Sequence, residues 1–380
     1  MEWDPSRFFQ PKGSSSPYAL LILNQPINEK AFGVLSRYAS YIICADGGAN
    51  RLFDMPEDND QLPDSIVGDL DSIRPAVREH YEKLGVSVLQ DPDQYSTDFT
   101  KCLKYLNAHA AEIIASPRKG AKATKSDTNG ANGSTSTSPS DQSPLEIVIL
   151  GGLGGRVDQA FSQVHHLYMM TQTQRSIREN ETDTSSSDAK PAAGGNLYLV
   201  SEESITFIIQ TGKNTIHTPA TRRADIVTGS ESGGSKSPRN RKRGQEQEQE
   251  QEPEPEYFFE ENIGIIPLSS PAMITTHGFE WDVENWHTEI GGQLSTSNHI
   301  RADKVEVETS VPVLFTVELA ERLKRKHHQA VRDISRFTEP RLSEAHRYRN
   351  FAIQAIATVK LASSNRCAPM PALKSRPQDG

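Results

Sequence analysis

The class of fold follows from one stretch of the sequence, Ser65–Asp91, which reads SIVGDLDSIRPAVREHYEKLGVSVLQD. The stretch opens with a short apolar strand, continues as a helix that Gly85 ends, and closes with a second strand. A strand, a helix and a strand in this order form a βαβ unit, whose two strands run parallel. The sequence therefore predicts a mainly parallel sheet around this unit.

The same alternation extends on both sides of that unit. Strands are predicted in YALLILN, SYIICADGG and LEIVILGG, and helices in NEKAFGVLSRY, in DFTKCLKYLNAHAAEII with Thr97 as its N-cap, and in VDQAFSQVHHLYMM. After Asn196 the segments LYLVS, SITFIIQ, NTIHTP, GIIPLSS, MITTHGFEW, KVEVETS and PVLFTVEL all resemble strands. We therefore predict an α/β domain over residues 18–195 and an all-β domain over residues 196–319.

Polar, low-complexity stretches interrupt this pattern. They contain too few apolar residues to offset the entropy of ordering them, so each is predicted to lie outside the packed fold. They are a disordered insertion at 116–144, a polar linker at 173–195, a disordered insertion at 219–256 and a tail from residue 362. A basic helix is predicted from about Glu318 to Phe337, so residues 320–380 form a C-terminal helix and tail. The basic run Arg239–Arg243 fits a nuclear signal, a binding patch or a solvated charge run.

Composition narrows the class of partner. A net charge of −9 argues against a basic surface that grips nucleic acid, so a small-molecule partner is predicted. The cysteines, Cys44, Cys102 and Cys367, form no CxxC pair, which argues against a disulfide framework or a cysteine zinc site. The N-terminal segment has no long apolar run, so a cytoplasmic protein without a membrane span is predicted.

Acidic segments follow several predicted strands. CADGGAN, GDLDS, QDPDQYSTDF and GGLGGRVD each come directly after a strand, and ligands of open parallel sheets bind at that end of the strands. Two acids at positions i and i+2 of an extended chain face the same side, and clustered carboxylates suit Mg²⁺ held together with substrate phosphates. The alternative is that one of the two acids caps the helix near Arg74 while the other lies in a turn. The acids expected to converge are Asp46, Asp69, Asp71 and Asp98.

Gly151–Arg156, GGLGGR, is the candidate phosphate-binding turn. Glycines let a backbone approach a phosphate, the following helix offers free N–H groups, and Arg156 adds a guanidinium fork. Asp158 would cap the helix or orient Arg156. The turn lacks the spacing of the dinucleotide fingerprint and of the P-loop, and the alternative is an ordinary strand-to-helix turn. The pairs His165–His166 and His327–His328 are interpreted as surface or packing residues.

Taken together, CADGGANRL, PDSIVGDLDS, DPDQYSTDFTK, LGGLGGRVDQ, GFEWDV and GGQLSTSN closely resemble the thiamine pyrophosphokinase (thiamin diphosphokinase) family. The resemblance is to fungal-type members with long low-complexity insertions and covers most of residues 18–318. It implies a Rossmann-like ATP-binding domain with a parallel sheet, followed by a β-sandwich domain that binds thiamine. It also implies a homodimer with thiamine between the subunits, and Mg²⁺-dependent transfer of the pyrophosphoryl group of ATP to the thiamine hydroxyl, giving thiamine diphosphate and AMP.

The resemblance assigns roles to individual residues. It implies Asp46, Asp69, Asp71 and Asp98 as metal ligands and Asp71, Asp98 and Arg156 as catalytic residues. It implies nucleotide contacts from Asp46, Gly47, Asn50, Gln94, Thr97, Lys101, Gly154 and Asp158, and thiamine contacts from Trp281, Ser295, Ser297 and Asn298. The alternative for Trp281 is a core or interface aromatic.

Tyr95 departs from the family pattern, because many relatives carry an acid at that position. This departure puts one acid of that strand end in doubt as a ligand but leaves Asp98 intact. Two other functions fit the same motifs. One is another Mg²⁺-dependent nucleotide transferase with a different acceptor alcohol, and the other is a non-catalytic nucleotide or thiamine sensor.

Overall fold

The structure is a computed structural model that describes residues 1–14, 16–55, 61–118, 143–184, 192–223 and 256–325. Most of the two predicted insertions, the basic run Arg239–Arg243, the pair His327–His328 and the C-terminal tail lie outside these residues. The described residues all lie within one compact unit, Met1–Lys326.

A parallel sheet forms the N-terminal half of this unit, as predicted. Its strands follow the order β7-β6-β2-β3-β4-β5, and residues of β2 pair in register with both neighbours, Leu21 with Ile43 of β3 and with Ile149 of β6. Successive residues of β2 face two different apolar clusters, which explains the unbroken apolar run of its sequence. The strands are β2 (Tyr18–Ile22), β3 (Tyr41–Ala45), β4 (Ser65–Gly68), β5 (Ser87–Gln90), β6 (Glu146–Leu150) and β7 (Leu197–Val200).

Helices cover both faces of this sheet. Apolar residues of α1 (Glu29–Tyr38), α2 (Gly48–Phe53) and α3 (Pro75–Lys83) join one cluster. Those of α4 (Asp98–Ala108), α5 (Ala110–Ala115) and α6 (Val157–Thr184) join the other. Thr97 caps α4 as predicted, because its side chain accepts a hydrogen bond from the Thr100 N–H. Gly85 follows α3 with a φ of +80°, a conformation that glycine adopts without strain.

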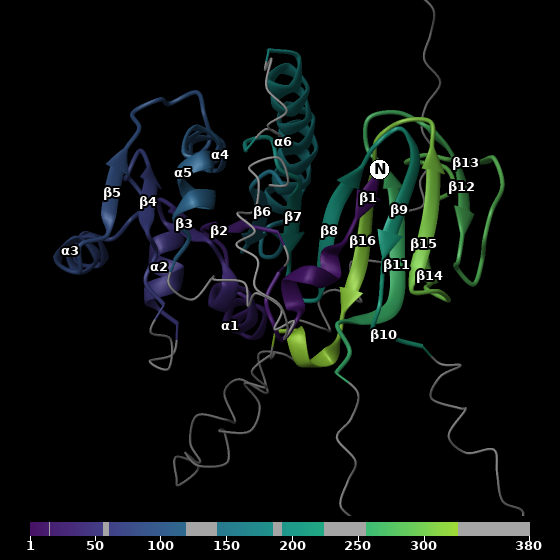
Figure 1. Cartoon of the computed structure of the whole chain (residues 1–380), viewed down its shortest axis with the longest axis horizontal. Helices are drawn as coiled ribbons and strands as arrows, with labels where there is room; N and C mark the ends of the chain where they lie inside the picture. The colour runs from purple at the N-terminus through teal and green to yellow at the C-terminus, as the bar shows by residue number, and fades with distance from the viewer. Residues whose placement is uncertain (15, 56–60, 119–142, 185–191, 224–255, 326–380) are drawn as a thin grey trace, which may run out of the picture. The chain divides into compact units, whose positions relative to one another are not determined.

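The C-terminal half is all β, as predicted, but its strands do not form an isolated domain. The antiparallel strands β8, β16 and β11 extend the parallel sheet beyond β7, while β9, β15, β12 and β13 build a second sheet (Figure 1). Side chains of both sheets meet in one apolar cluster. The strands are β8 (Ser204–Ile209), β9 (Gly212–His217), β10 (Thr221–Arg222), β11 (Phe259–Pro267), β12 (Ala272–His277), β13 (Trp286–Thr288), β14 (Ser295–His299), β15 (Lys304–Thr309) and β16 (Val313–Leu319).

Residues before position 18, which the predicted domain leaves out, belong to the fold. Strand β1 (Glu2–Trp3) pairs with β9, and a short 3-10 helix, η1 (Pro5–Phe9), follows it. Trp3 is buried, and its indole N–H donates to the Asn214 side chain at 3.0 Å. A two-residue strand carries no periodicity that a sequence pattern can detect, so this part was missed.

The predicted polar linker 173–195 is wrong over its first half, because α6 continues to Thr184. Polar side chains face inwards there: Gln174 is only 2% exposed and donates to the Gly195 carbonyl, while Arg178 donates to the Gly194 carbonyl at 2.9 Å. In this half of the helix, hydrogen bonds to backbone add to the apolar packing that α6 makes through Leu167 and Ile177.

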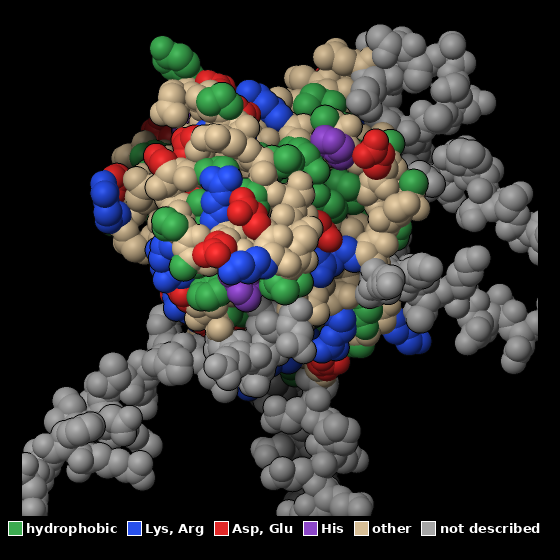
Figure 2. Space-filling model, turned by 90° about the vertical axis from the view of Figure 1, so that its left-hand side faces the viewer, with side chains coloured by type: hydrophobic (Ala, Val, Ile, Leu, Met, Phe, Trp, Pro, Cys, Tyr) green, Lys and Arg blue, Asp and Glu red, His purple; other side chains and the backbone are tan. Residues whose placement is uncertain are grey.

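The predicted start of the basic C-terminal helix is also wrong. Glu318 lies in β16, which ends at Leu319, and a short 3-10 helix, η3 (Glu321–Leu323), follows. The remainder of the predicted helix lies outside the described residues. Within the described part of the chain, no helix is both long and apolar enough to cross a membrane. On the face nearest α3 and β5, acidic and basic side chains are interspersed (Figure 2).

Candidate active site at the ends of the parallel strands

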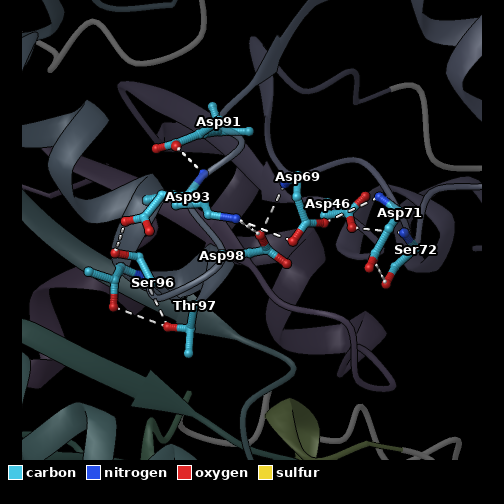
Figure 3. Close-up of polar contacts among 12 residues, drawn as sticks. Asp46, Asp69, Asp71, Ser72, Asp91, Asp93, Ser96, Thr97 and Asp98 are labelled. Carbon is cyan, nitrogen blue, oxygen red and sulfur yellow. Dashed lines mark hydrogen bonds and ion pairs between the residues drawn. The ribbon is translucent and has the colours of Figure 1, made fainter.

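Three carboxylates meet where the parallel strands end. Asp46 follows β3, Asp69 follows β4 and Asp98 begins α4, and one oxygen of each lies within 4.8 Å of the others (Figure 3). Asp46 is fully buried, whereas Asp69 and Asp98 are partly exposed. We call these residues the acidic triad. The predicted convergence of strand ends is confirmed for these three acids.

Backbone contacts fix the buried member of the triad. The two oxygens of Asp46 accept hydrogen bonds from the Ser72 and Ile73 N–H groups, both at 2.9 Å. Gly68 makes the close approach possible, because a Cβ there would lie 2.6 Å from the Asp46 Cβ and 3.0 Å from Asp98 Oδ1. Gly68 is therefore needed for the geometry of the triad and not only for a turn.

A buried lysine lies against the triad. The Lys101 ammonium, whose side chain is fully buried, lies 3.4 Å from Asp69 Oδ2 and 3.2 Å from Asp98 Oδ1. Burial disfavours this charge, but the hydrogen bonds and charges of Asp98 and Asp69 outweigh that effect and raise the Lys101 pKa. Lys101 pairs with two of the three carboxylates, and Asp46 forms no ion pair within the described residues, so the cluster keeps excess negative charge.

The environment separates the pKa values of two triad members. Burial raises the pKa of Asp46, and the neighbouring charges of Asp98 and Asp69 raise it further. Burial alone would also raise the pKa of Asp69, but hydrogen bonds from the Asp71 N–H and from Lys101 together lower it. Like charges held this close favour either a shared proton or a bound cation.

Asp71 does not join the triad, contrary to the expected extended backbone. Leu70 has a φ of +66°, which turns the chain between the two acids. Asp71 is exposed and accepts a hydrogen bond from the Ser72 hydroxyl at 2.8 Å. The helix-cap alternative also fails, because Arg74 occupies the N-cap position of α3 and no side chain caps that end.

A cavity of about 440 Å³ opens beside the triad. Two of its walls come from predicted segments, Thr97 and Asp98 at the start of α4 and Arg156 before α6. Arg156 and Asp158 form a two-point pair, with 3.1 Å from Nε to Oδ1 and 2.6 Å from Nη2 to Oδ2. Asp158 therefore orients Arg156, one of the two predicted possibilities, and the hydrogen bond from Arg156 lowers the Asp158 pKa.

Several residues implied as nucleotide contacts do not line this cavity. Asn50 instead holds the loop after β4, since its side chain donates to the Ser72 carbonyl and accepts from the Arg74 N–H. Gly47 packs against Asn24, where a Cβ would lie 2.3 Å from the side-chain nitrogen. Gln94 is exposed, and Gly154 has open space around its Cα.

Sequence reasoning missed other residues of the cavity wall. Asn24 and Gln25 follow β2, so the strand-end rule already applied to four other strands would have found them. Gln159, Gln163 and His166 recur at helical spacing after Arg156 and lie on the cavity side of α6. His166 was interpreted as a surface or packing residue, but it lines the cavity, with its Nδ1 bonded to the Ser162 carbonyl at 2.7 Å.

The residues implied for thiamine gather elsewhere, around β14. The side-chain oxygen of Asn298 accepts from the Trp281 N–H at 3.2 Å, and its amide donates to the Trp281 carbonyl at 3.0 Å. Trp281 is 54% exposed, which rules out the alternative of a core aromatic within this chain. Ser295 and Ser297 lie in the same strand. None of these residues lines the cavity beside the triad.

An α/β sheet that gathers carboxylates, a lysine and an arginine at its strand ends defines a protein of the class that binds phosphorylated ligands. Comparison with known proteins narrows this class. The family model "Thiamin pyrophosphokinase, catalytic domain" matches residues 32–178, and "Thiamin pyrophosphokinase, vitamin B1 binding domain" matches residues 247–314. Together they span more than half of the chain, which belongs to the thiamin pyrophosphokinase family.

Individual relatives agree with this assignment. The chain is 28% identical over 319 residues to thiamine pyrophosphokinase 1 of Oryza sativa, covering 80% of this chain and 89% of the relative. It is 26% identical over 325 residues to thiamine pyrophosphokinase of Saccharomyces cerevisiae, covering 79% and 85%. The solved structure of thiamin pyrophosphokinase from Candida albicans matches with a TM-score of 0.57 at 25% identity, covering 84% of this chain and 93% of that one.

Proposed function

We propose that this chain is a thiamine pyrophosphokinase, which transfers the pyrophosphoryl group of ATP to the hydroxyl of thiamine and releases AMP. The observation that carries the proposal is the acidic triad beside a cavity whose wall includes Arg156. A non-catalytic nucleotide binder has no need to hold three like charges together next to a polyanion. The family assignment supports the enzyme over the two other functions considered from the sequence.

The triad fits a magnesium ion. Three carboxylate oxygens within 4.8 Å are the hard, anionic donors that Mg²⁺ takes together with substrate phosphates. Burial and then the charges of Asp98 and Asp69 raise the Asp46 pKa, and a bound cation would relieve the repulsion between these charges. We propose Asp46, Asp69 and Asp98 as its ligands, with Asp71 at the rim of the site. When bound, the ion supplies charge neutralisation for the phosphate oxygens.

The residues of the chain position and neutralise the triphosphate. Arg156, held by Asp158, offers its guanidinium to phosphate oxygens in the cavity, and the buried Lys101 adds positive charge behind the triad. The thiamine oxygen forms a bond to the β-phosphorus, and the bond between that phosphorus and the oxygen of the α-phosphate breaks, leaving AMP. Such transfers depend on positioning and charge more than on covalent help. Asp71 and Asp98 are our candidates to accept the hydroxyl proton.

Trp281 is proposed as the platform for thiamine. Its exposed indole suits the cationic thiazolium and the flat pyrimidine, through cation–π attraction and stacking. Ser295 and Ser297 are proposed as polar contacts, while Asn298 uses its amide on the backbone of Trp281.

A second copy of the chain is needed to bring the two sites together. Strand β14 pairs with β11, and the strands β16, β8, β7, β6 and β2 lie between β11 and β3. At about 4.8 Å per strand, β14 and β3 are on the order of 30 Å apart along the sheet, too far for one substrate pair to bridge. We propose a homodimer in which thiamine bound at β14 of one subunit faces the triad of its partner. The large exposed side chains Val157 and Phe161, both 70% exposed beside Arg156, offer an apolar surface for such a contact.

Product analysis tests the reaction. Purified protein, ATP and thiamine are expected to yield AMP and thiamine diphosphate in equal amounts with MgCl₂, and neither product when EDTA replaces it. Release of ADP, or AMP formation that ignores thiamine, would contradict the proposal. The cytoplasmic location and the absence of nucleic-acid partners stay predictions.

Complementation tests the shared site. Asp98→Asn and Trp281→Ala each disable one half of a site, so each variant alone should be nearly inactive at low thiamine concentration. Co-expressed chains form mixed dimers that contain one intact site, and about one quarter of the parent activity should return. If the mixture is no more active than the two variants measured separately, each site lies within one chain.

A further inference from the structure

Among the described residues, the indole of Trp281 has one neighbouring ring and is otherwise largely exposed. The imidazole of His299 lies 5.0 Å from it, centroid to centroid, with the two planes tilted by 45°. More than half of the Trp281 side chain is nevertheless exposed, whereas that of His299 is only 24% exposed. His299 therefore supports the indole from the protein side and leaves the outer side free.

The Asn298 side chain and the main chain hold the Trp281 and His299 rings in place. The Asn298 side-chain oxygen that accepts from the Trp281 N–H also accepts from the His299 N–H at 2.8 Å. The backbone is tied a second time, because the Glu280 N–H donates to the His299 carbonyl at 2.9 Å. The position of the imidazole relative to the indole is thus set by the main chain of both segments.

A charged network fixes the orientation of the imidazole. His299 Nδ1 lies 2.7 Å from Glu280 Oε2, and Arg301 donates to both Glu280 and Glu261. Hydrogen bonds from His299 and then from Arg301 lower the Glu280 pKa, which favours the anionic form of this carboxylate. We call Glu261, Glu280, His299 and Arg301 the paired cluster, because two acids face two bases.

We infer that His299 is a positioning residue for the thiamine platform: it holds the Trp281 indole in one orientation, ready to receive a flat cationic ring on its open side. The inference rests on the proposed function of the chain. An exposed indole loses rotational freedom when a ligand stacks on it, and a ring that restricts it beforehand lowers that entropic loss. His299 acts through Trp281 and does not itself touch substrate.

Two substitutions separate this role from a general structural one. His299→Ala removes the supporting ring, and about a three- to tenfold rise in the thiamine KM is expected, with kcat and the ATP KM within twofold of the parent. His299→Phe keeps a flat ring and should leave the thiamine KM within about twofold of the parent. His287→Ala, an exposed histidine of β13, is the matched control and should change none of these values.

A spectroscopic readout makes the test independent of turnover. Each protein is compared with the same protein carrying Trp281→Phe. The polarised fluorescence intensities of the Trp281→Phe form are subtracted, and the anisotropy of Trp281 is calculated from the difference. It should fall in His299→Ala and be kept in His299→Phe. If the parent makes no thiamine diphosphate, the proposed function fails while the anisotropy still reports on the support. The inference is overturned if His299→Ala leaves the anisotropy and the thiamine KM unchanged, or if it raises the ATP KM equally.

Discussion

The acidic triad and the paired cluster place carboxylates close together in opposite ways. In the triad, Asp46, Asp69 and Asp98 lie together, only Asp69 and Asp98 contact Lys101, and burial keeps water from screening the carboxylates fully. In the paired cluster, Glu261 and Glu280 are matched by Arg301 and His299. In the first arrangement Asp46 forms no ion pair within the described residues, whereas in the second Arg301 pairs with both acids.

This difference indicates what each group of charges is for. Excess charge of one sign destabilises a fold unless something outside the chain neutralises it, so its retention points to a ligand. Carboxylates that share an arginine orient neighbouring side chains and need no external ion. The triad is therefore the candidate chemical centre, and the paired cluster is a scaffold under the exposed Trp281.

Removing one carboxylate from each group should give the largest contrast. Asp98→Asn takes away a proposed metal ligand, so activity is expected to fall about a thousandfold or more, with an unfolding temperature close to that of the parent. Glu280→Gln takes away a scaffold charge and should leave kcat within about threefold. Steady-state AMP release and thermal unfolding check both variants. Similar losses of activity in Asp98→Asn and Glu280→Gln would contradict the proposal that the triad is the chemical centre and the paired cluster a scaffold.

Crowding the triad should have the next largest effect. In Gly68→Ala the added Cβ would lie 2.6 Å from the Asp46 Cβ, so the carboxylates must move apart. Displacements of this kind lower rates by roughly ten- to a hundredfold. Gly33→Ala is the matched control, because nothing lies within 4 Å of its added Cβ in α1. The rate of AMP release is measured for Gly68→Ala and for Gly33→Ala. Equal rates would show that the reaction tolerates a displacement of the triad carboxylates.

Removing the lysine that pairs with the triad should alter stability. In Lys101→Met the chain keeps a side chain of similar length but leaves three carboxylates facing one another. A loss of about 1–3 kcal/mol in unfolding free energy is expected without divalent ions, less than for a fully buried pair because two of the acids are partly exposed. Millimolar MgCl₂ should restore much of it. Denaturant unfolding with and without Mg²⁺ measures this, and a variant that Mg²⁺ does not stabilise would count against the metal site.

The smallest effect concerns the paired cluster and pH. The lowered pKa of Glu280 means that its contribution to stability is present above its ordinary value of 4.5 and is lost as pH falls through the lower folded-state value. The parent should therefore exceed Glu280→Gln in unfolding temperature at neutral pH, and the difference should vanish below that range. A difference that stays constant from pH 3 to pH 7 would mean that charge is not the cause.

Much of the fold can be predicted from the sequence because its signals are local. Buried parallel strands such as Glu146–Leu150 are short and mainly apolar in sequence. Thr97 is a residue type that caps helices, so it marks the start of α4. Strand β1 could not be predicted, since its two residues pair with β9 more than 200 positions away. The full length of α6 could not be predicted either. Gln174 and Arg178 are polar residues typical of a linker, and their hydrogen bonds to the Gly195 and Gly194 carbonyls appear only in the folded chain.

The candidate site also contains residues that the sequence predicts and residues that it does not. The strand-end rule locates Asp46, Asp69 and Asp98, because topology alone brings those ends together. It does not reveal that Leu70 turns the chain and moves Asp71 out of the triad, since no pattern in the sequence encodes a positive φ at a leucine. The contact between His299 and Trp281 could not be predicted either, because it depends on the antiparallel bridge between Phe279 and Ile300.

Binding of Mn²⁺, followed by electron paramagnetic resonance as a substitute for Mg²⁺, tests the distinction between the two groups most directly. The parent and Glu280→Gln should both bind one Mn²⁺ tightly in the presence of a non-hydrolysable ATP analogue, and Asp98→Asn should lose that ion. Equal binding by Asp98→Asn and the parent, or loss of the ion in Glu280→Gln, would contradict the assignment of the triad as the metal centre.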